Sequence, residues 1–542
     1  MSGAGSFRGR RPWVRARVVV GVVALVAALG MAGCSSAGPS GSSGAVGPAG
    51  SSAASGVPHR GGSVTELALE DVTTIDPAFN TIAITNSYEM PTLEAVYGPG
   101  LVYLDPVSGA VEMGFAESLT TKDSGKVWTL VLHPGLKFSD GTAFDAAAVA
   151  FNIARDADPA TGSPLQSTAA QLSTKVVSPT ELQITCTPAD AQFPTIMSQD
   201  FAMIASPAAV QKEGKNFGTH PVGPGPFKVQ SSVYGISWSF VRNPEYQLFA
   251  PGQPYLDSIK VQATSSTQQT LTALQTGAAQ TFITSNGTEG AQARAIGFTV
   301  VADPQPGLVY LTFNTSKPPF NNLTAREAVY DAISEEGVAN VWAPGNPVVT
   351  NLFNSNSPFY STQYNFPAQN TAEAQQLFNQ LAAEGRPLQF SVLWPAIGSI
   401  GNLPSYLIGA FSQFKNVKVT SDAVPQTQFT QDIATSNFDL GEAIVGSPVP
   451  GVAQTFETNG SSNFSKFSDP VLDAALAQLQ VTTDTATQKQ LWATIQQELI
   501  KQYPGVPVYR PVQGFVYDPS KLGGITLTQS GLQAFWGPMY LK

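Results

Sequence analysis

Charged side chains make up only 12% of this 542-residue chain, about half the share of a typical globular protein. The surface must therefore draw most of its polarity from neutral residues such as Ser, Thr, Asn and Gln. Acidic residues outnumber basic ones by 38 to 28, which gives a formal net charge of −10. Binding to a phosphate backbone needs a basic surface, so this balance argues against nucleic acid as a partner.

Residues that commonly carry catalysis or bind metals are also scarce. The chain has three histidines, His59, His133 and His220, which are far apart in sequence and stand beside Gly or Pro. They offer little material for a metal site or a catalytic triad. The sequence has no GxSxG, HExxH, CxxC, GxxxxGK[ST] or GxGxxG motif. We expect no enzymatic activity, metal or cofactor, although a pair of carboxylates anywhere in the chain could still serve a lipid-anchored hydrolase.

The chain has one long uncharged apolar run, Val18 to Gly30, which follows five arginines between residues 8 and 17. At about 1.5 Å per residue, this helix is too short to cross a ~30 Å hydrocarbon core, so a signal peptide is expected. Small residues then precede Cys34 in Met-Ala-Gly-Cys, which resembles a bacterial lipobox and predicts lipidation of Cys34. Residues 35–59 are almost wholly Ser, Gly, Ala and Pro and predict a disordered tether. Cys186, the other cysteine, is expected as a buried thiol in a strand.

From about residue 60 onward, apolar alternation and Gly/Pro punctuation predict alternating strands and helices. Ser468-Asp469-Pro470 predicts a helix start, and Thr324 to Glu327 has the spacing of a capping box. A helix is also expected to begin near Thr142. The predicted strands are Ser63–Leu69, Val127–Leu132, Glu181–Cys186, Phe227–Val229, Ser237–Arg242, Leu308–Asn314, Leu388–Leu393, Val417–Ser421 and Val506–Arg510.

Five segments, in order along the chain, resemble motifs of the substrate-binding proteins of ABC importers known as solute-binding family 5, the dipeptide, oligopeptide and nickel type. The most distinctive segment runs from Leu130 to Asp145 (LVLHPGLKFSDGTAFD). The others are Thr74–Pro77 with Val96–Leu101, Pro221–Phe227, Phe313–Phe320 with Arg326, and Phe438–Leu440 with Asn463, Phe464 and Asp469–Leu476. Their Gly and Pro residues are typical of turns, so the motifs identify a scaffold and leave the ligand open.

The resemblance implies a two-lobed α/β fold of the type II periplasmic-binding-protein kind, peptide-binding class, with an extra subdomain. It places two extended crossovers between the lobes at Leu308–Asn314 and Val506–Pro511. Residues 1–34 are then the signal peptide with its lipobox, and 35–59 the tether. Lobe one comprises 60–100, 217–307 and 510–542, its extra subdomain 101–216, and lobe two 308–509.

The resemblance also implies a function. We expect an extracytoplasmic, monomeric lipoprotein that is anchored to the cell membrane through Cys34. It would capture a small solute between its lobes and deliver it to a permease that works with an ATPase. A sensory or adhesive lipoprotein that reuses the fold is the further alternative. Matching the cleft segments of the family gives the expected ligand-binding residues as Tyr88, Met90, Trp394, Glu442, Val445, Gly446, Ser447, Tyr509 and Arg510.

The ligand itself is left open between a free peptide, a modified peptide, a saccharide and a metal chelate. Peptide-binding relatives carry an aspartate that binds the peptide's α-ammonium group, and Pro448 stands at about its position in this chain. Residues 443–455 contain no acidic residue. Glu442 falls six residues earlier. We therefore expect a neutral or weakly charged polar solute.

Overall fold

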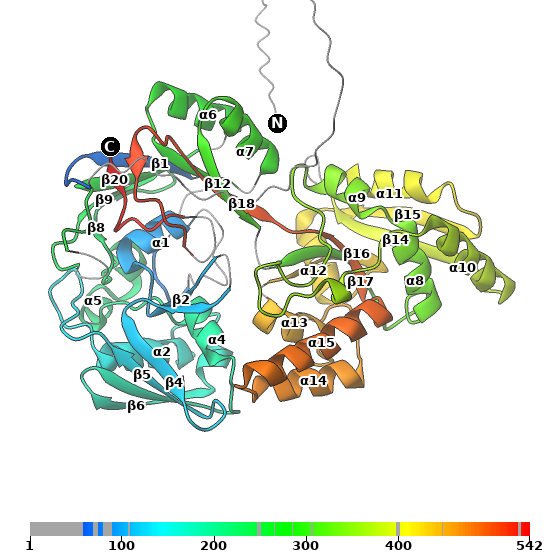
Figure 1. Ribbon diagram of the computed structural model, residues 1–542, viewed down its shortest axis with the longest axis horizontal. Helices are drawn as coiled ribbons and strands as arrows, with labels where there is room; N and C mark the ends of the chain where they lie inside the picture. The colour runs from blue at the N-terminus through cyan, green and yellow to red at the C-terminus, as the bar shows by residue number, and fades with distance from the viewer. Residues whose placement is uncertain are drawn as a thin grey trace, which may run out of the picture. The chain divides into compact units, whose positions relative to one another are not determined.

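The computed structural model describes residues 58–68, 74–79, 89–106, 109–246, 251–264, 266–284, 286–304, 307–396, 402–446, 448–528 and 533–542. All of them belong to the compact unit Gly56–Lys542. Three sheets of four or more strands organise this unit, and helices pack on them (Figure 1). The predicted signal peptide, Cys34 and most of the tether lie outside the described residues.

The first large sheet has seven strands in the order β12-β18-β11-β1-β10-β9-β8. Strand β1 pairs in parallel with β10 and β11, and the remaining pairs are antiparallel. The strands are β1 (Ser63–Ala68), β8 (Phe227–Val233), β9 (Ser237–Arg242), β10 (Ser258–Ala263), β11 (Thr281–Thr284), β12 (Thr299–Pro304) and β18 (Val512–Tyr517). The elements around it are α1 (Met90–Tyr97), α5 (Pro207–Glu213), η1 (Gly214–Thr219), α6 (Thr267–Thr276), α7 (Gly287–Ala295), β19 (Leu522–Gly523) and β20 (Tyr540–Leu541).

A separate antiparallel sheet has four strands in the order β4-β5-β7-β6. In β5 and β7 every second residue is buried, which is the pattern of strands with one face on a core. Cys186 ends β7 as a buried, free thiol, as predicted, and burial raises its pKa to about 12. The elements of this part are β2 (Val102–Leu104), β3 (Val111–Met113), β4 (Ala116–Thr121), β5 (Val127–Leu132), α2 (Ala146–Ala157), α3 (Gln166–Ala169), β6 (Leu172–Ser178), β7 (Glu181–Cys186) and α4 (Phe193–Asp200).

The third sheet has five strands in the order β15-β14-β16-β13-β17, with a hydrophobic core on each face. Its strands are β13 (Leu308–Phe313), β14 (Leu388–Pro395), β15 (Val417–Val424), β16 (Leu440–Val445) and β17 (Gly505–Tyr509). Helices α8 (Leu323–Ala332), α9 (Glu335–Trp342), α10 (Thr371–Ala383) and α11 (Leu403–Phe411) supply one core. Helices α13 (Pro448–Phe456), α14 (Pro470–Gln480) and α15 (Thr485–Gln502) supply the other, while α12 (Gln426–Ala434) and η2 (Thr362–Tyr364) complete the elements.

The chain passes from the seven-stranded to the five-stranded sheet between Pro304 and Leu308, and returns between Tyr509 and Val512. The fold is therefore a two-lobed α/β fold whose lobes are joined by two extended segments. We call the part built on the seven-stranded sheet lobe one, the part on the four-stranded sheet the subdomain, and the part on the five-stranded sheet lobe two. The exact residue ranges predicted for these parts stay predictions.

Helix starts show where the sequence patterns succeed and fail. Asp469 caps α14 through hydrogen bonds from the N–H groups of Val471 and Leu472, which confirms the predicted start. The predicted capping box at Thr324 is wrong, because Asn322 caps α8 by accepting from the Ala325 N–H at 3.1 Å. The helix expected near Thr142 begins only at Ala146, since Asp145 is its cap.

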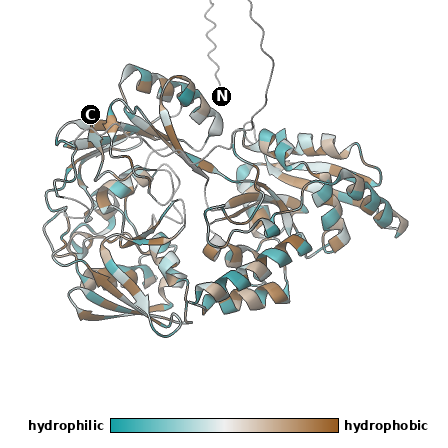
Figure 2. Cartoon of the chain, in the orientation of Figure 1, coloured by the Kyte–Doolittle hydropathy of each residue, from teal (hydrophilic) through white to brown (hydrophobic). Residues whose placement is uncertain are grey.

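Hydrophobic residues concentrate in the strands, and the helices mix hydrophobic with hydrophilic positions (Figure 2). Such helices bury one side and expose the other. Within the described ranges, no helix combines the length and the apolar character needed to cross a membrane.

Candidate ligand-binding site

Three strands of lobe two direct their carboxyl ends to one edge of its sheet. Strand β14 runs parallel to β16, and β13 pairs antiparallel with both β16 and β17, so β14, β16 and β17 point the same way. In open α/β sheets, ligands bind outside such carboxyl ends. Trp394, Glu442 and Tyr509 lie on these three strands.

An aromatic cluster connects Trp394 and Tyr509 through a further residue, Trp342. The Trp342 ring, from α9, lies edge-on to Trp394 with ring centroids 4.7 Å apart, and edge-on to Tyr509 at 5.3 Å. Trp394 is 0% exposed and Tyr509 is half-buried. In this arrangement Trp394 supports Trp342 from inside the core, whereas Tyr509 keeps solvent-facing surface that a ligand can touch.

Glu442 is a carboxylate in an otherwise apolar setting. It lies in the middle of β16, directly opposite the fully buried Leu311, and is itself half-buried. Among the described residues, no side chain or backbone N–H donates a hydrogen bond to its carboxylate, although its backbone pairs with β13. Burial raises the pKa of Glu442 to about 7. Its negative charge in turn helps to raise the pKa of Tyr509, after the larger effect of burial.

Beyond Glu442, the carboxyl end of β16 is exposed to solvent. Ile444, two residues further along the same face of β16, has 59% of its surface exposed. The Glu442 carboxylate, the Tyr509 ring and the exposed Ile444 side chain can together bind a small solute that has both polar and apolar parts. A cationic or hydrogen-bond-donating group beside Glu442 would offset the cost of burying its charge.

The other predicted site residues lie elsewhere. Val445 is buried under α13, and Gly446 is exposed at the end of β16. Met90 is buried at the start of α1 in lobe one, away from the cluster in lobe two. Arg510 is 5% exposed, and its guanidinium donates to the carbonyl oxygens of Gly307, Asn351 and Leu352. Tyr88 and Ser447 lie outside the described residues.

The structure thus brings Trp394, Glu442 and Tyr509 together, while ligand contact by each predicted residue stays a prediction. Sequence reasoning missed Trp342, the residue that links two of them. The apolar spacing of Val338 and Trp342 behind the cap Ser334 was the available signal for its helix. Such spacing indicates a buried face and says nothing about the strand ends that this face meets.

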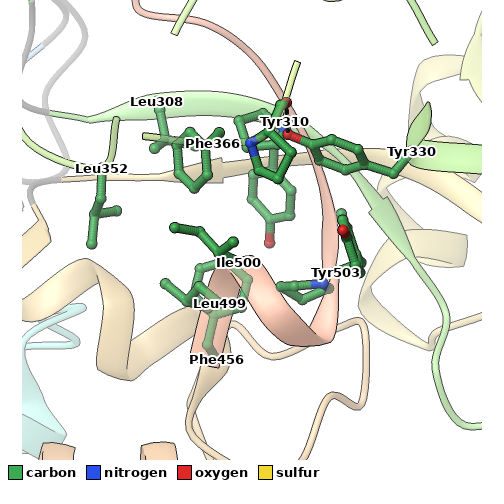
Figure 3. Close-up of a pocket in the computed structure, with 13 residues that line it drawn as sticks. Leu308, Tyr310, Tyr330, Leu352, Phe366, Phe456, Leu499, Ile500 and Tyr503 are labelled. Carbon is green, nitrogen blue, oxygen red and sulfur yellow. Dashed lines mark hydrogen bonds between the residues drawn. The ribbon is translucent and has the colours of Figure 1, made fainter. Parts of the chain in front are cut away.

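A small cavity lies inside lobe two between β13, β17 and α15 (Figure 3). Its lining is almost wholly apolar, and the Tyr330 hydroxyl at its rim donates to the Pro367 carbonyl oxygen at 2.7 Å. The volume of about 30 Å³ has room for only a few water molecules. This cavity is too small for an organic solute.

A larger cavity of about 120 Å³ lies between the subdomain and lobe two. Asp190, Gln192 and Ile196 line it from the subdomain, and residues of α13, α14 and α15 line it from lobe two. Apolar side chains such as Leu476 and Leu479 share the wall with Asp190 and Glu457, and burial raises the pKa of both carboxyls.

Two carboxyls of lobe one, Glu66 and Glu94, are 0% and 1% exposed. Burial raises the pKa of Glu94 to about 8 and shifts that of Glu66 in the same direction. Neither presents a surface to a substrate, so they do not form an accessible acid–base pair. Over the part of the chain that the structure describes, no group of three or more His, Cys, Asp or Glu residues is arranged to hold a metal ion.

Comparison with known proteins gives the fold and the sequence a context. The chain is 32% identical over 232 residues to a protein named glutathione-binding protein GsiB, from Escherichia coli O1:K1 / APEC. That match covers 42% of this chain and 44% of the relative, so it spans less than half of the relative's length.

Two solved structures share the fold over nearly the whole of their chains. HbpA2 from Haemophilus parasuis superposes with a TM-score of 0.77 at 19% identity, over 89% of this chain and 100% of that one. The oligopeptide-binding protein AppA from Bacillus subtilis, solved in complex with a nonapeptide, superposes with a TM-score of 0.70 at 17% identity, over 90% and 100%.

The sequence profile of the family described as "Bacterial extracellular solute-binding proteins, family 5 Middle" matches residues 110–460. This range takes in most of the subdomain, five of the seven strands of the seven-stranded sheet (β8 to β12) and lobe two as far as α13, which is well over half of the chain. The chain belongs to family 5 of the bacterial extracellular solute-binding proteins.

Proposed function

We propose that this protein is the substrate-binding component of an ABC importer, which captures a small solute between its lobes and presents it to a membrane permease. The observation that carries the proposal is the family match over residues 110–460. In this role the protein makes and breaks no covalent bond. Its partners are the solute, a permease and an ATPase, and it acts as a monomer outside the cytoplasm, anchored through lipidated Cys34.

The solute in this proposal is a small polar organic molecule of peptide-like character. A relative that carries the name glutathione-binding protein and a fold neighbour solved with a nonapeptide support this class. The carboxylate of Glu442 beside Tyr509 supports a donor group on the solute, either an ammonium or neutral N–H and O–H groups. A free peptide offers the first, and a blocked peptide or a saccharide offers the second.

Isothermal titration calorimetry with the purified protein tests this. The panel contains glutathione, free di- to pentapeptides, their N-acetylated forms, oligosaccharides and a nickel–histidine chelate. One or more of these solutes should bind at one molecule per chain, with a dissociation constant in the micromolar range or below. Absence of binding by the whole panel, or turnover of a bound solute, would contradict the proposal.

Glu442→Gln then separates the two kinds of donor. If the solute places an ammonium beside Glu442, the variant should lose about 10-fold or more in affinity, since a charge-assisted hydrogen bond contributes about 1.5–3 kcal/mol. If the solute offers neutral donors, the loss should stay within a few-fold. Glu336→Gln, an exposed position on α9 in the same lobe, is the matched control and should bind like the wild type.

A further inference from the structure

We infer that the subdomain and lobe two form a latch, a pair of hydrogen bonds that holds the two lobes together and sets how tightly the protein retains its solute. This inference rests on the proposed capture of a solute between the lobes. The latch consists of Ala191 and Gln192 on the subdomain and the carbonyl oxygens of Leu479 and Gln480 at the end of α14.

The subdomain side of the latch is a rigid turn. The Asp190 N–H donates to the Gly125 carbonyl oxygen at 3.0 Å, and the Trp128 indole N–H donates to the Asp190 carbonyl oxygen at 3.0 Å. The Asp190 carboxylate accepts from the Gln192 N–H at 2.8 Å. A Cβ on Gly125 would lie 2.4 Å from the Asp190 carbonyl oxygen, so the turn sits directly on the β4–β5 hairpin. These contacts fix the direction in which Ala191 and Gln192 present their donors.

The lobe-two side of the latch is the carboxyl terminus of a helix. The last four carbonyl groups of an α-helix lack partners within the helix and carry partial negative charge. In α14, the Leu479 carbonyl oxygen also accepts from the N–H groups of Val481 and Thr482, the latter at 3.2 Å, so a donor from outside the helix shares this acceptor with local ones. Two further donors come from the subdomain.

Two hydrogen bonds join the subdomain to lobe two. The Ala191 N–H donates to the Gln480 carbonyl oxygen at 2.6 Å, and the Gln192 side-chain amide donates to the Leu479 carbonyl oxygen at 3.2 Å. One donor is backbone and the other is a half-buried side chain, so a single substitution at Gln192 removes half of the latch.

The surroundings of the latch are loosely packed. The cavity of about 120 Å³ beside it is lined by Gln192 and Ile196 on one side and by Leu476 and Leu479 on the other. Tight interfaces have few voids of this size. The latch can therefore open without the loss of a large close-packed core.

The latch lies across the molecule from the segments that join the lobes. In Figure 1, α4 and α14 approach each other at the end opposite to β12 and β18. A contact at that end breaks when the lobes separate and forms when they close. It therefore stabilises the closed form whether or not a solute is present, and every increase in the closed population raises the apparent affinity.

Hydrogen–deuterium exchange of the ligand-free full chain tests the latch, because the Ala191 amide is itself one of the donors. Wild-type Ala191 should exchange more slowly than an unstructured amide. Gln192→Ala should speed its exchange by about 2- to 10-fold, the range of one hydrogen bond. Gln192→Glu should speed it further, since a carboxylate would face the negative end of α14.

Gln166 provides the matched control. It is a half-buried glutamine of the same subdomain, and its side-chain amide bonds to Ala157 within the subdomain. Gln166→Ala and Gln166→Glu should leave Ala191 exchange unchanged. Equal melting temperatures of the Gln192 and Gln166 variants would show that exchange reports the latch and not global unfolding.

An unprotected Ala191 in the wild type, or protection that neither Gln192 variant lowers, would overturn the inference. The outcome is separable from that of solute binding, because no solute is added. Protection that depends on Gln192 in a protein that binds no solute would leave the latch standing and overturn the importer proposal. Solute binding with an unprotected Ala191 would do the reverse.

Discussion

The guanidinium of Arg510 donates to the carbonyl oxygen of Gly307 at 2.9 Å, so the side chain that follows β17 holds the backbone that precedes β13. These two residues stand at the two segments that join the lobes. Arg510 also donates to the carbonyl oxygens of Asn351 at 2.8 Å and Leu352 at 3.1 Å. Burial lowers its pKa to about 10, and the side chain is still charged at neutral pH.

Replacement of this arginine should therefore be costly. In Arg510→Met, three buried carbonyl oxygens lose a charged donor, and we expect the free energy of unfolding to fall by about 2–4 kcal/mol. Urea denaturation measures the change. Arg386→Met, at an exposed arginine paired with Glu384, should change stability by less than about 1 kcal/mol. An equally small loss at Arg510 would contradict the structural role given to it.

Glu442 should make stability depend on pH in a defined direction. Burial raises the pKa of its carboxyl from an ordinary value of 4.5 to about 7, so the folded state binds more protons between these values. The contribution of the protonated Glu442 carboxyl to the free energy of unfolding is fully present below pH 4.5. It is lost as the pH rises through 7, by up to about 3 kcal/mol. Wild type should therefore lose stability relative to Glu442→Gln between about pH 5 and 8, as measured by urea denaturation at each pH. A difference between the two proteins that is constant with pH would refute this.

A close contact between glycines should not tolerate a side chain. A Cβ on Gly287, at the start of α7, would lie 2.6 Å from the carbonyl oxygen of Gly345 in lobe two. Gly287→Ala should destabilise the protein by about 1–3 kcal/mol, the usual cost of overpacking. Gly409→Ala is the control, because this α11 glycine has open space at its Cβ and should gain up to about 1 kcal/mol. Thermal unfolding compares the two variants. An unchanged melting temperature of Gly287→Ala would show that the lobes move apart at this contact to make room for the methyl group.

The predicted lipid anchor depends on one atom, the sulfur of Cys34. Cys34→Ala should give a folded protein that leaves the membrane fraction, since lipid chains provide the hydrophobic anchoring energy. Immunoblots of membrane and soluble fractions measure its distribution. Cys186→Ala, at the buried thiol, should stay with the membrane. Retention of Cys34→Ala at the wild-type level would disprove the anchor.

The sequence was most informative where local pattern alone determines an element. Apolar alternation predicted β5, β7 and β9 with the observed bounds, and Asp469-Pro470 marked the start of α14. It was less informative where neighbouring residues compete for one role. Asn322 caps α8, where Thr324 had been predicted to do so, and the helix expected to begin near Thr142 begins after the cap Asp145, because Asn322 and Asp145 each offer a side-chain acceptor to the first N–H groups of the helix.

The candidate site could be predicted only in part, because it depends on which strand ends meet in space. Family resemblance pointed to Trp394, Glu442 and Tyr509, and the structure places them on three strands of one sheet, β14, β16 and β17, of which only β14 and β16 are adjacent. The resemblance could not show that Trp394 is fully buried. Strand β14 continues to Pro395, beyond its predicted end at Leu393, and this places the Trp394 indole in the core. The latch between Gln192 and Leu479 joins residues 287 positions apart, a distance over which periodicity carries no information.

Native mass spectrometry of the purified full chain is the direct test of solute capture. The protein is examined as isolated and again after incubation with glutathione and the peptide, blocked-peptide and saccharide panel. We expect one small molecule per chain, either carried through purification or taken up from the panel, and its release when the protein is unfolded. A protein that has the mass of the bare chain under all of these conditions would refute solute capture.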